Sequence, residues 1–175
     1  LLGIPVTVRH VTPDSIQGDM AFLSLLKQMG AVLTNSPDGI TVTGPKHGIY
    51  RGITCDMHAC SDQAITMAAL AIFAQTPTTI TGIGHIRYQE SDRIHAICTE
   101  LGRMGIHCEE TEDSIRIHPG APAPSLIRTY DDHRMAMGFS LIGLRAEGIR
   151  IDDPGCCRKT FREYFSVLDG ALSLL

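Results

Sequence analysis

The stretch "LLKQMGAVLTNSPDGITV" (residues 25–42) decides the fold, because a related stretch, "ELGRMGIHCEETEDSIRI" (residues 100–117), follows 75 residues later. The two stretches share a leucine, a methionine–glycine pair, an aspartate and two β-branched residues at one spacing: Leu26, Met29, Gly30, Asp38, Ile40 and Val42, then Leu101, Met104, Gly105, Asp113, Ile115 and Ile117. In each copy the glycine ends a helical pattern, and a strand pattern follows it. A helix-to-strand unit that recurs at this period predicts a chain of stacked, similar units.

The repeat extends beyond these stretches. "PVTVRHV" (Pro5 to Val11) resembles "PTTITGI" (Pro77 to Ile83), and "GIRIDDP" (Gly148 to Pro154) is a third partial copy. Before the second and third of these strands lie helices that are apolar nearly all round, Ala64 to Ala74 and Met135 to Leu144, which predicts that both are buried. After each strand comes an amphipathic stripe: Phe22 to Met29, Ile94 to Met104, and Phe161 to Leu168. The expected fold is therefore α/β, a pseudo-symmetric repeat of helix, strand, helix and strand pair.

The units are not equally complete. Counting back by 71 residues from Asp62 puts the opening helix of the first unit before Leu1, and the third unit lacks the strand pair. We therefore expect residues 1–175 to form one domain that is truncated at its N-terminal end. The first residue is Leu1 rather than methionine, which agrees with this expectation.

Composition excludes several classes of protein. The chain is 43% hydrophobic and 19% charged, with a net charge of −4 and no run of lysine or arginine, which argues against disorder and against nucleic-acid binding. Its longest apolar run is too short to cross a bilayer, so no membrane partner is expected. No signal sequence precedes the six cysteines, which favours reduced thiols and a cytoplasmic location, with Cys98 as core filling.

A zinc site deserves a test because Cys55, His58 and Cys60 lie close in sequence and Cys156 and Cys157 are adjacent. No C-x-x-C pair occurs, and adjacent cysteines do not easily chelate one ion. A zinc-binding structural protein therefore remains an alternative rather than the leading interpretation.

Acids, bases and cations gather at the predicted helix starts. Asp62 and the run Asp131 to Arg134 open the two buried helices, whereas Gln89 to Arg93 and Arg158 to Thr160 precede amphipathic helices. If the units pack side by side, these helix starts converge, and helix N-termini favour anions. The cations Arg93, Arg134 and Lys159 suit phosphate or carboxylate, and Asp62, Glu90 and His133 are candidate general acids and bases.

Each of these residues also has a purely structural interpretation. Asp62 alone suits a helix N-cap, and Thr160 with Glu163 suits a capping box. Asp132 beside Arg134 suits a surface ion pair of little energetic value, and a lone His133 suits a structural histidine. The density of "QESDR" and "DDHRMAM" at matched positions of the repeat favours the functional interpretation.

Three motifs carry a resemblance to a known family: "QESDRI" (Gln89 to Ile94), "YDDHRMAM" (Tyr130 to Met137) and "DPGCCRKTFREYF" (Asp153 to Phe165). They resemble the C-terminal motifs of the 5-enolpyruvylshikimate-3-phosphate synthases, the shikimate-pathway enolpyruvyl transferases, and "IQGDMAFLSLLKQMGA" (Ile16 to Ala31) is similar to the family's preceding repeat. The resemblance implies a two-domain enzyme, each domain built from three β-α-β-α-β-β units with buried parallel helices. It also implies phosphoenolpyruvate and shikimate-3-phosphate as substrates between the domains, with no metal or organic cofactor.

The resemblance assigns roles position by position. Asp62 matches an aspartate that contacts the shikimate hydroxyls and acts as a base, and Glu90 matches a glutamate implicated in proton transfer. Arg93, Arg134 and Lys159 resemble the cations that hold phosphoenolpyruvate, with His133 beside them. Two substrate-binding positions depart from the family: Gln89 stands where lysine is usual, and His85 stands near a usual asparagine.

The implied function is transfer of the enolpyruvyl group to the 5-hydroxyl of shikimate-3-phosphate with release of phosphate, for aromatic amino acid biosynthesis. The family's N-terminal domain is missing, so this chain is expected to carry half an active site and to be inactive alone. Two further alternatives remain: a non-catalytic phosphate- or carboxylate-binding module, and the sibling family that transfers enolpyruvyl to UDP-N-acetylglucosamine.

Overall fold

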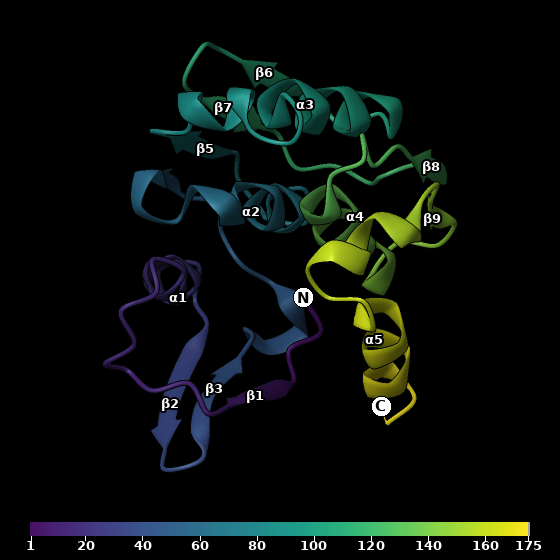
Figure 1. Cartoon of the computed structure of the whole chain (residues 1–175). Coiled ribbons are helices and arrows are strands. Elements are labelled where there is room, and N and C mark those ends of the chain that lie inside the picture. Colours follow the sequence, from purple (N-terminus) through teal and green to yellow (C-terminus); the bar gives the residue numbers. More distant parts are fainter. Residues whose placement is uncertain (175) are drawn as a thin grey trace.

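Three copies of one α/β unit follow one another in the computed structural model, which describes residues 1–174 (Figure 1). The second copy has the order β-α-β-α-β-β: β4 (Thr54–Asp56), α2 (Ala64–Ala71), β5 (Thr78–Thr81), α3 (Arg93–Arg103), β6 (Cys108–Glu110) and β7 (Ile115–Ile117). The first copy contains β1 (Pro5–Arg9), α1 (Met20–Gln28), β2 (Val32–Ser36) and β3 (Gly39–Thr43). The third contains β8 (Ser125–Ile127), α4 (His133–Ser140), β9 (Ile149–Ile151) and α5 (Tyr164–Leu172). The predicted α/β repeat is confirmed.

Short 3₁₀ helices connect these elements, at Lys46–Gly48, His58–Gln63, Gly84–Tyr88, Leu141–Leu144 and Pro154–Lys159. Among residues 1–174, no helix combines the length and apolar character needed to cross a membrane.

Each unit forms its own small sheet. The strand orders are β1-β3-β2, β4-β5-β7-β6 and β8-β9. The first strand of a unit runs parallel to the second, as in β4 with β5 and β8 with β9, and the second pairs antiparallel with the last, as in β1 with β3 and β5 with β7. The shared register, with Val6 opposite Val42 and the equivalent Thr78 opposite Ile117, shows that the sequence repeat is also a repeat of strand pairing.

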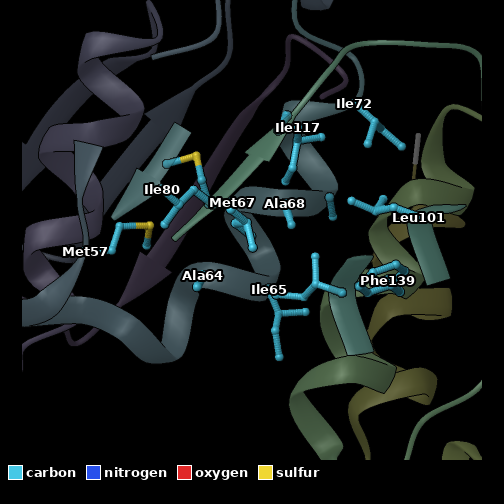
Figure 2. Packing of buried hydrophobic residues seen from close by; sticks show 14 of the residues in the cluster. Met57, Ala64, Ile65, Met67, Ala68, Ile72, Ile80, Leu101, Ile117 and Phe139 are labelled. Atoms are coloured by element: carbon cyan, nitrogen blue, oxygen red, sulfur yellow. The ribbon is translucent and has the colours of Figure 1, made fainter. Parts of the chain in front are cut away.

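The two helices predicted to be buried lie side by side at the centre of the molecule (Figure 1). Helix α2 is buried along nearly its whole length, and half of its eight residues are alanine, which allows close approach of its neighbours (Figure 2). At Gly138 of α4, an added Cβ would lie 2.6 Å from Cγ2 of Ile65. Phe139 of α4 and Leu101 of α3 complete this core, in which both are fully buried. The prediction that these two helices are buried is therefore confirmed.

An apolar pocket of about 300 Å³ lies where the first unit meets the centre of the molecule. Its lining includes residues of the first sheet, α1, α2 and the turn after α4: Val6, Phe22, Leu26, Leu70, Leu141 and Leu144.

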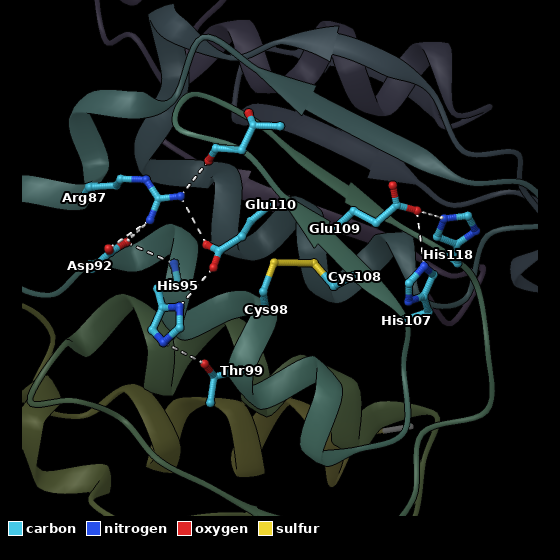
Figure 3. Close-up of a disulfide and its surroundings, with 11 residues drawn as sticks. Arg87, Asp92, His95, Cys98, Thr99, His107, Cys108, Glu109, Glu110 and His118 are labelled. Atoms are coloured by element: carbon cyan, nitrogen blue, oxygen red, sulfur yellow. Dashed lines mark hydrogen bonds and ion pairs between the residues drawn. A yellow bond between two sulfur atoms is a disulfide. The ribbon is translucent and has the colours of Figure 1, made fainter.

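The expectation that all cysteines are reduced is wrong for one pair. Cys98 of α3 and Cys108 of β6 form a disulfide, with a Cα–Cα distance of 5.4 Å (Figure 3). Cys98 is partly buried and packs against the hydrophobic core as expected, but it also crosslinks α3 to β6. The other four cysteines are free and buried, and burial raises the pKa of Cys55 to about 11 and of Cys156 to about 12.

The third amphipathic helix begins later than the sequence predicts. The chain from Pro154 to Lys159 forms a 3₁₀ helix, and α5 begins at Tyr164 instead of Phe161. The residue before α5 is Glu163, whose side chain caps nothing, so the predicted capping box with Thr160 does not form.

Candidate active site

Arg93 is the centre of the candidate site. It is the first residue of α3, whose start is fixed by Asp92, because that carboxylate accepts a hydrogen bond from the backbone N–H of His95 at 3.0 Å. The Arg93 side chain is buried, with 4% of its surface exposed. Its Nε and Nη2 atoms donate to the two carboxylate oxygens of Asp132, at 2.7 and 3.2 Å. This two-pronged pair joins the start of α3 to the start of α4.

Asp132 is fully buried and serves two purposes. It caps α4 by accepting from the backbone N–H of Arg134 at 2.9 Å, and it accepts from the hydroxyl of Ser91 at 3.1 Å. Burial alone would raise its pKa, but the hydrogen bonds and charge of Arg93 outweigh burial and lower the pKa. The interpretation of Asp132 as half of a surface ion pair is therefore wrong.

Asp62 bridges two arginines. Its Oδ1 lies 3.0 Å from Nη1 of Arg93, and its Oδ2 lies 2.8 Å from Nη2 of Arg134. Gln63, not Asp62, stands at the N-cap position of α2, and no side chain caps that helix. The capping interpretation of Asp62 is thus wrong. Gln89 joins the same group, because its side-chain oxygen accepts from Nη1 of Arg93.

Glu90 connects the remaining polar residues. One of its carboxylate oxygens lies 2.9 Å from Nδ1 of His133 and 3.9 Å from Nη2 of Arg93, and the other lies 3.2 Å from Nζ of Lys159. His133 is largely buried, whereas the Lys159 side chain is about half exposed, at 48%. The hydrogen bond that Lys159 donates to Glu90 raises the pKa of the lysine. Lys159 is therefore charged at neutral pH, and because its side chain is half exposed it can turn toward a ligand.

Three side chains of this group, Asp62, His133 and Arg134, border a pocket of about 210 Å³. Asp62 lines it from the second unit, and the third unit contributes His133, Arg134, Thr160 and Tyr164. Three cations thus meet three carboxylates and a histidine beside a cavity of small-molecule size. Such an arrangement binds anions and moves protons between neighbouring groups.

His85 stands apart from this group. Its Nε2 lies 2.8 Å from the hydroxyl of Ser61, and its ring packs edge-on against His58 with centroids 5.3 Å apart. It is therefore linked to Asp62 only through the backbone of the turn 58–63, whereas the other seven sequence-predicted site residues are in direct contact with one another.

Two residues to which the sequence assigned no role in the site complete it. Ser91 holds Asp132, and the phenol of Tyr164 donates to the carbonyl of Met137 at 3.0 Å along the pocket wall. Asp132 was visible in "DDHR", but its role depends on a partner 39 residues away. No sequence pattern marked Tyr164 as anything other than the apolar stripe of a helix.

Comparisons with known proteins agree on one family. The family model of EPSP synthase (3-phosphoshikimate 1-carboxyvinyltransferase) matches residues 1–168. The 3-phosphoshikimate 1-carboxyvinyltransferase of Nostoc punctiforme is 50% identical over 164 residues, which cover 94% of this chain and 38% of that protein. The chloroplastic protein of the same name from Brassica napus is 42% identical and is covered to 34% of its length, against 97% of this chain.

Solved structures give the same result. An EPSP synthase from Acinetobacter baumannii matches with a TM-score of 0.82 and 27% identity, over 97% of this chain and 42% of that one. The enolpyruvyl transferase NikO from Streptomyces tendae matches with a TM-score of 0.72 at 18% identity, which supports the fold alone. The chain thus spans about two-fifths or less of the proteins that it matches.

Proposed function

The chain belongs to the EPSP synthase (3-phosphoshikimate 1-carboxyvinyltransferase) family, and from this premise we propose that it carries part of an enolpyruvyl transferase active site. The reaction moves the enolpyruvyl group of phosphoenolpyruvate to the 5-hydroxyl of shikimate-3-phosphate and releases inorganic phosphate. The observation that carries the proposal is the buried Arg93, held by Asp132 and Asp62 where three helix starts meet.

The proposed role of the cations in this site is to bind the anionic groups of phosphoenolpyruvate. Phosphoenolpyruvate brings a phosphate and a carboxylate, and both need positive charge and hydrogen-bond donors. Arg93 is fixed by its carboxylate partners, which favours a preset orientation. Arg134 lines the pocket and Lys159 is exposed, so these two are the cations that can turn toward the substrate. Binding would break the contacts of Arg134 with Asp62 and of Lys159 with Glu90.

The proposed role of the carboxylates and the histidine is proton transfer. A proton added to the methylene carbon of phosphoenolpyruvate makes the neighbouring carbon electrophilic, and the substrate 5-hydroxyl attacks that carbon while losing its own proton to a base. The carbon–oxygen bond to phosphate then breaks, phosphate leaves with the electron pair, and the methyl group returns one proton to the enzyme. Glu90, between His133 and Lys159, is the proposed donor and acceptor for the methyl proton.

A second group of residues is proposed to contact shikimate-3-phosphate. Asp62 faces the pocket and is the proposed base for the hydroxyl. Gln89, which contacts Arg93, and His85, which contacts Ser61, are proposed to approach the shikimate phosphate. Gln89 offers hydrogen bonds without charge, so this side depends on cations supplied from elsewhere in the enzyme.

We further propose that this chain is the C-terminal part of a two-domain enzyme. Helices α2 and α4 are equivalent in the repeat, and a third equivalent helix would precede β1. The apolar pocket of about 300 Å³ borders β1, α1, α2 and the turn after α4, and it suits apolar side chains projecting from a helix in that position. An N-terminal domain would then supply the remaining substrate contacts. A cytoplasmic location stays a prediction from the sequence.

The test is a chimera in which this chain replaces the matching 38% of the Nostoc punctiforme relative. Phosphate release is measured with phosphoenolpyruvate and shikimate-3-phosphate, with each substrate omitted in turn, and with UDP-N-acetylglucosamine as a control acceptor. We expect release only when both shikimate-pathway substrates are present, and none from the 175-residue chain alone. A folded chimera without turnover, or robust turnover by the chain alone, contradicts the proposal.

A further inference from the structure

Two histidines and a glutamate meet on the hairpin of β6 and β7, outside the site described above. Nε2 of His107 and Nε2 of His118 lie 3.2 and 2.9 Å from the same oxygen of Glu109. The two imidazole rings lie 4.7 Å apart between centroids. Figure 3 shows the three side chains turned toward one another. All three are open to solvent to some degree, with side-chain exposures of 68% for His107, 33% for His118 and 55% for Glu109.

The hairpin itself fixes this arrangement. Cys108 pairs with Ile117, and the N–H of His118 donates to the carbonyl of His107 at 3.0 Å, so the two histidines are cross-strand neighbours. Glu109 lies two residues after His107 and therefore points to the same face of the strand. Cys108, between them, points to the opposite face, where its disulfide with Cys98 ties β6 to α3. His107 and His118 flank the paired ends of β6 and β7, so the three ligating groups are held by a crosslinked hairpin.

We propose that His107, Glu109 and His118 form a binding site for a divalent transition-metal ion, with Zn²⁺ as the probe. Two ligands that bind zinc at about 2.1 Å in tetrahedral geometry lie about 3.4 Å apart. The two nitrogen–oxygen distances of 3.2 and 2.9 Å are close to this value, and the ligand atoms of the three residues all lie within 4.8 Å of one another. Small side-chain rotations suffice to admit the ion, and solvent completes its coordination.

The ligand chemistry selects the class of metal. Imidazole nitrogens favour Zn²⁺, Ni²⁺, Co²⁺ and Cu²⁺, whereas Mg²⁺ and Ca²⁺ favour sites built from oxygen atoms. A second group with this spacing, Glu90, Asp132 and His133, lies in the candidate active site. There both carboxylates are already engaged by Arg93 and Lys159, so that group is the weaker candidate for a metal.

The cysteine positions that raised zinc from the sequence are different from these. Cys55 and Cys60 are buried, and burial raises the pKa of both thiols, which opposes the thiolate form that zinc requires. Within residues 1–174, neither cysteine belongs to a group of ligands close enough to share an ion. The hairpin site is therefore independent of the cysteines and of the catalytic proposal.

The experiment is calorimetric titration of the chelator-treated 175-residue chain with Zn²⁺ at neutral pH, with circular dichroism to check folding. We expect one saturable ion per chain and a higher melting temperature when it is bound. His107→Ala, His118→Ala and Glu109→Gln each remove one ligand from an exposed position. Each is expected to lower the association constant by about tenfold or more, since even the loss of an outer-shell partner has that effect.

The matched control is His10→Asn, because His10 is also exposed and its φ of 61° suits asparagine. This variant should bind Zn²⁺ as the parent chain does. The proposal is overturned if the folded chain shows no saturable binding, or if the double variant His107→Ala/His118→Ala binds as tightly as the parent. Loss of binding on His133→Ala with retention in the double variant would also overturn it, by moving the ion to the active site.

Discussion

Replacing Arg93 with methionine should destabilise the chain strongly, because it leaves the buried carboxylate of Asp132 without its counter-charge. Asp132 has no exposed surface, and Arg93 provides two of its hydrogen bonds together with its counter-charge. Breaking a buried ion pair by removing one partner costs about 3–5 kcal/mol. The hydroxyl of Ser91 and the N–H of Arg134 remain as donors, so the lower end of that range, about 3 kcal/mol, is the expected loss.

The assay is urea unfolding followed by circular dichroism. For a domain of this size a loss of about 3 kcal/mol lowers the midpoint by about 1–2 M urea. Arg150→Met is the control, because Arg150 lies exposed on β9 and such surface changes stay within about 0.5 kcal/mol. The double variant Arg93→Met/Asp132→Asn should be more stable than Arg93→Met alone, since it removes the stranded charge.

The pH dependence adds a second readout for the same substitution. In the parent chain Arg93 lowers the pKa of Asp132 below its usual 3.8, so this stabilisation is complete above pH 3.8 and is lost as the pH falls through the lowered pKa. Without Arg93, burial raises the pKa of Asp132 and the carboxyl stays protonated in mild acid. The difference between Arg93→Met and the parent should therefore shrink as the pH falls from 7 toward 4. A variant as stable as Arg150→Met at pH 7, or a double variant no better than Arg93→Met, refutes the reasoning.

Three further predictions follow from the same contacts. In the chimera with the Nostoc relative, Glu90→Gln should lower kcat by about a hundredfold or more with unchanged circular dichroism, because the amide cannot carry the proton; unchanged kcat would contradict the assigned role. Lys159→Ala in the chimera should raise KM for phosphoenolpyruvate by about tenfold while kcat changes less, since an exposed cation contributes mainly to binding; a pure kcat effect in steady-state kinetics would contradict this. Gly138→Ala should destabilise the chain by about 1–3 kcal/mol, because the new Cβ would lie 2.6 Å from Ile65, whereas Gly143→Ala meets nothing closer than 3.8 Å and should have little effect on urea unfolding.

The repeat made most of the fold predictable, because buried helices and amphipathic helices have strong and different patterns. The helix α2, apolar all round, was identified from composition alone, and the structure buries it as expected. The residue patterns did not show β4 and β8, since three residues are too few to show an alternating pattern, and only the family resemblance implied a strand at these places. The late start of α5 was also missed, because its aromatic stripe begins in the preceding turn.

The candidate site was predictable as a group of residues but not as a network. The motifs named Arg93, Asp62 and Glu90, whereas the contacts that orient them join residues 31 to 43 positions apart. Asp132 resembled a surface charge, because burial of a carboxylate depends on a partner that no local pattern reveals. The same reason applies to the disulfide, which depends on how β6 lies along α3 rather than on the compartment that the composition suggests.

The most direct test of the proposed chemistry is to run the chimera in D₂O and measure deuterium in the vinyl methylene of the enolpyruvyl product by mass spectrometry. Protonation of the phosphoenolpyruvate methylene by a solvent-exchangeable group such as Glu90, followed by loss of one methyl proton, predicts a product that carries deuterium. The label should depend on shikimate-3-phosphate and should fall together with turnover in Glu90→Gln. A product formed at full rate without deuterium would contradict protonation, addition and elimination at this site.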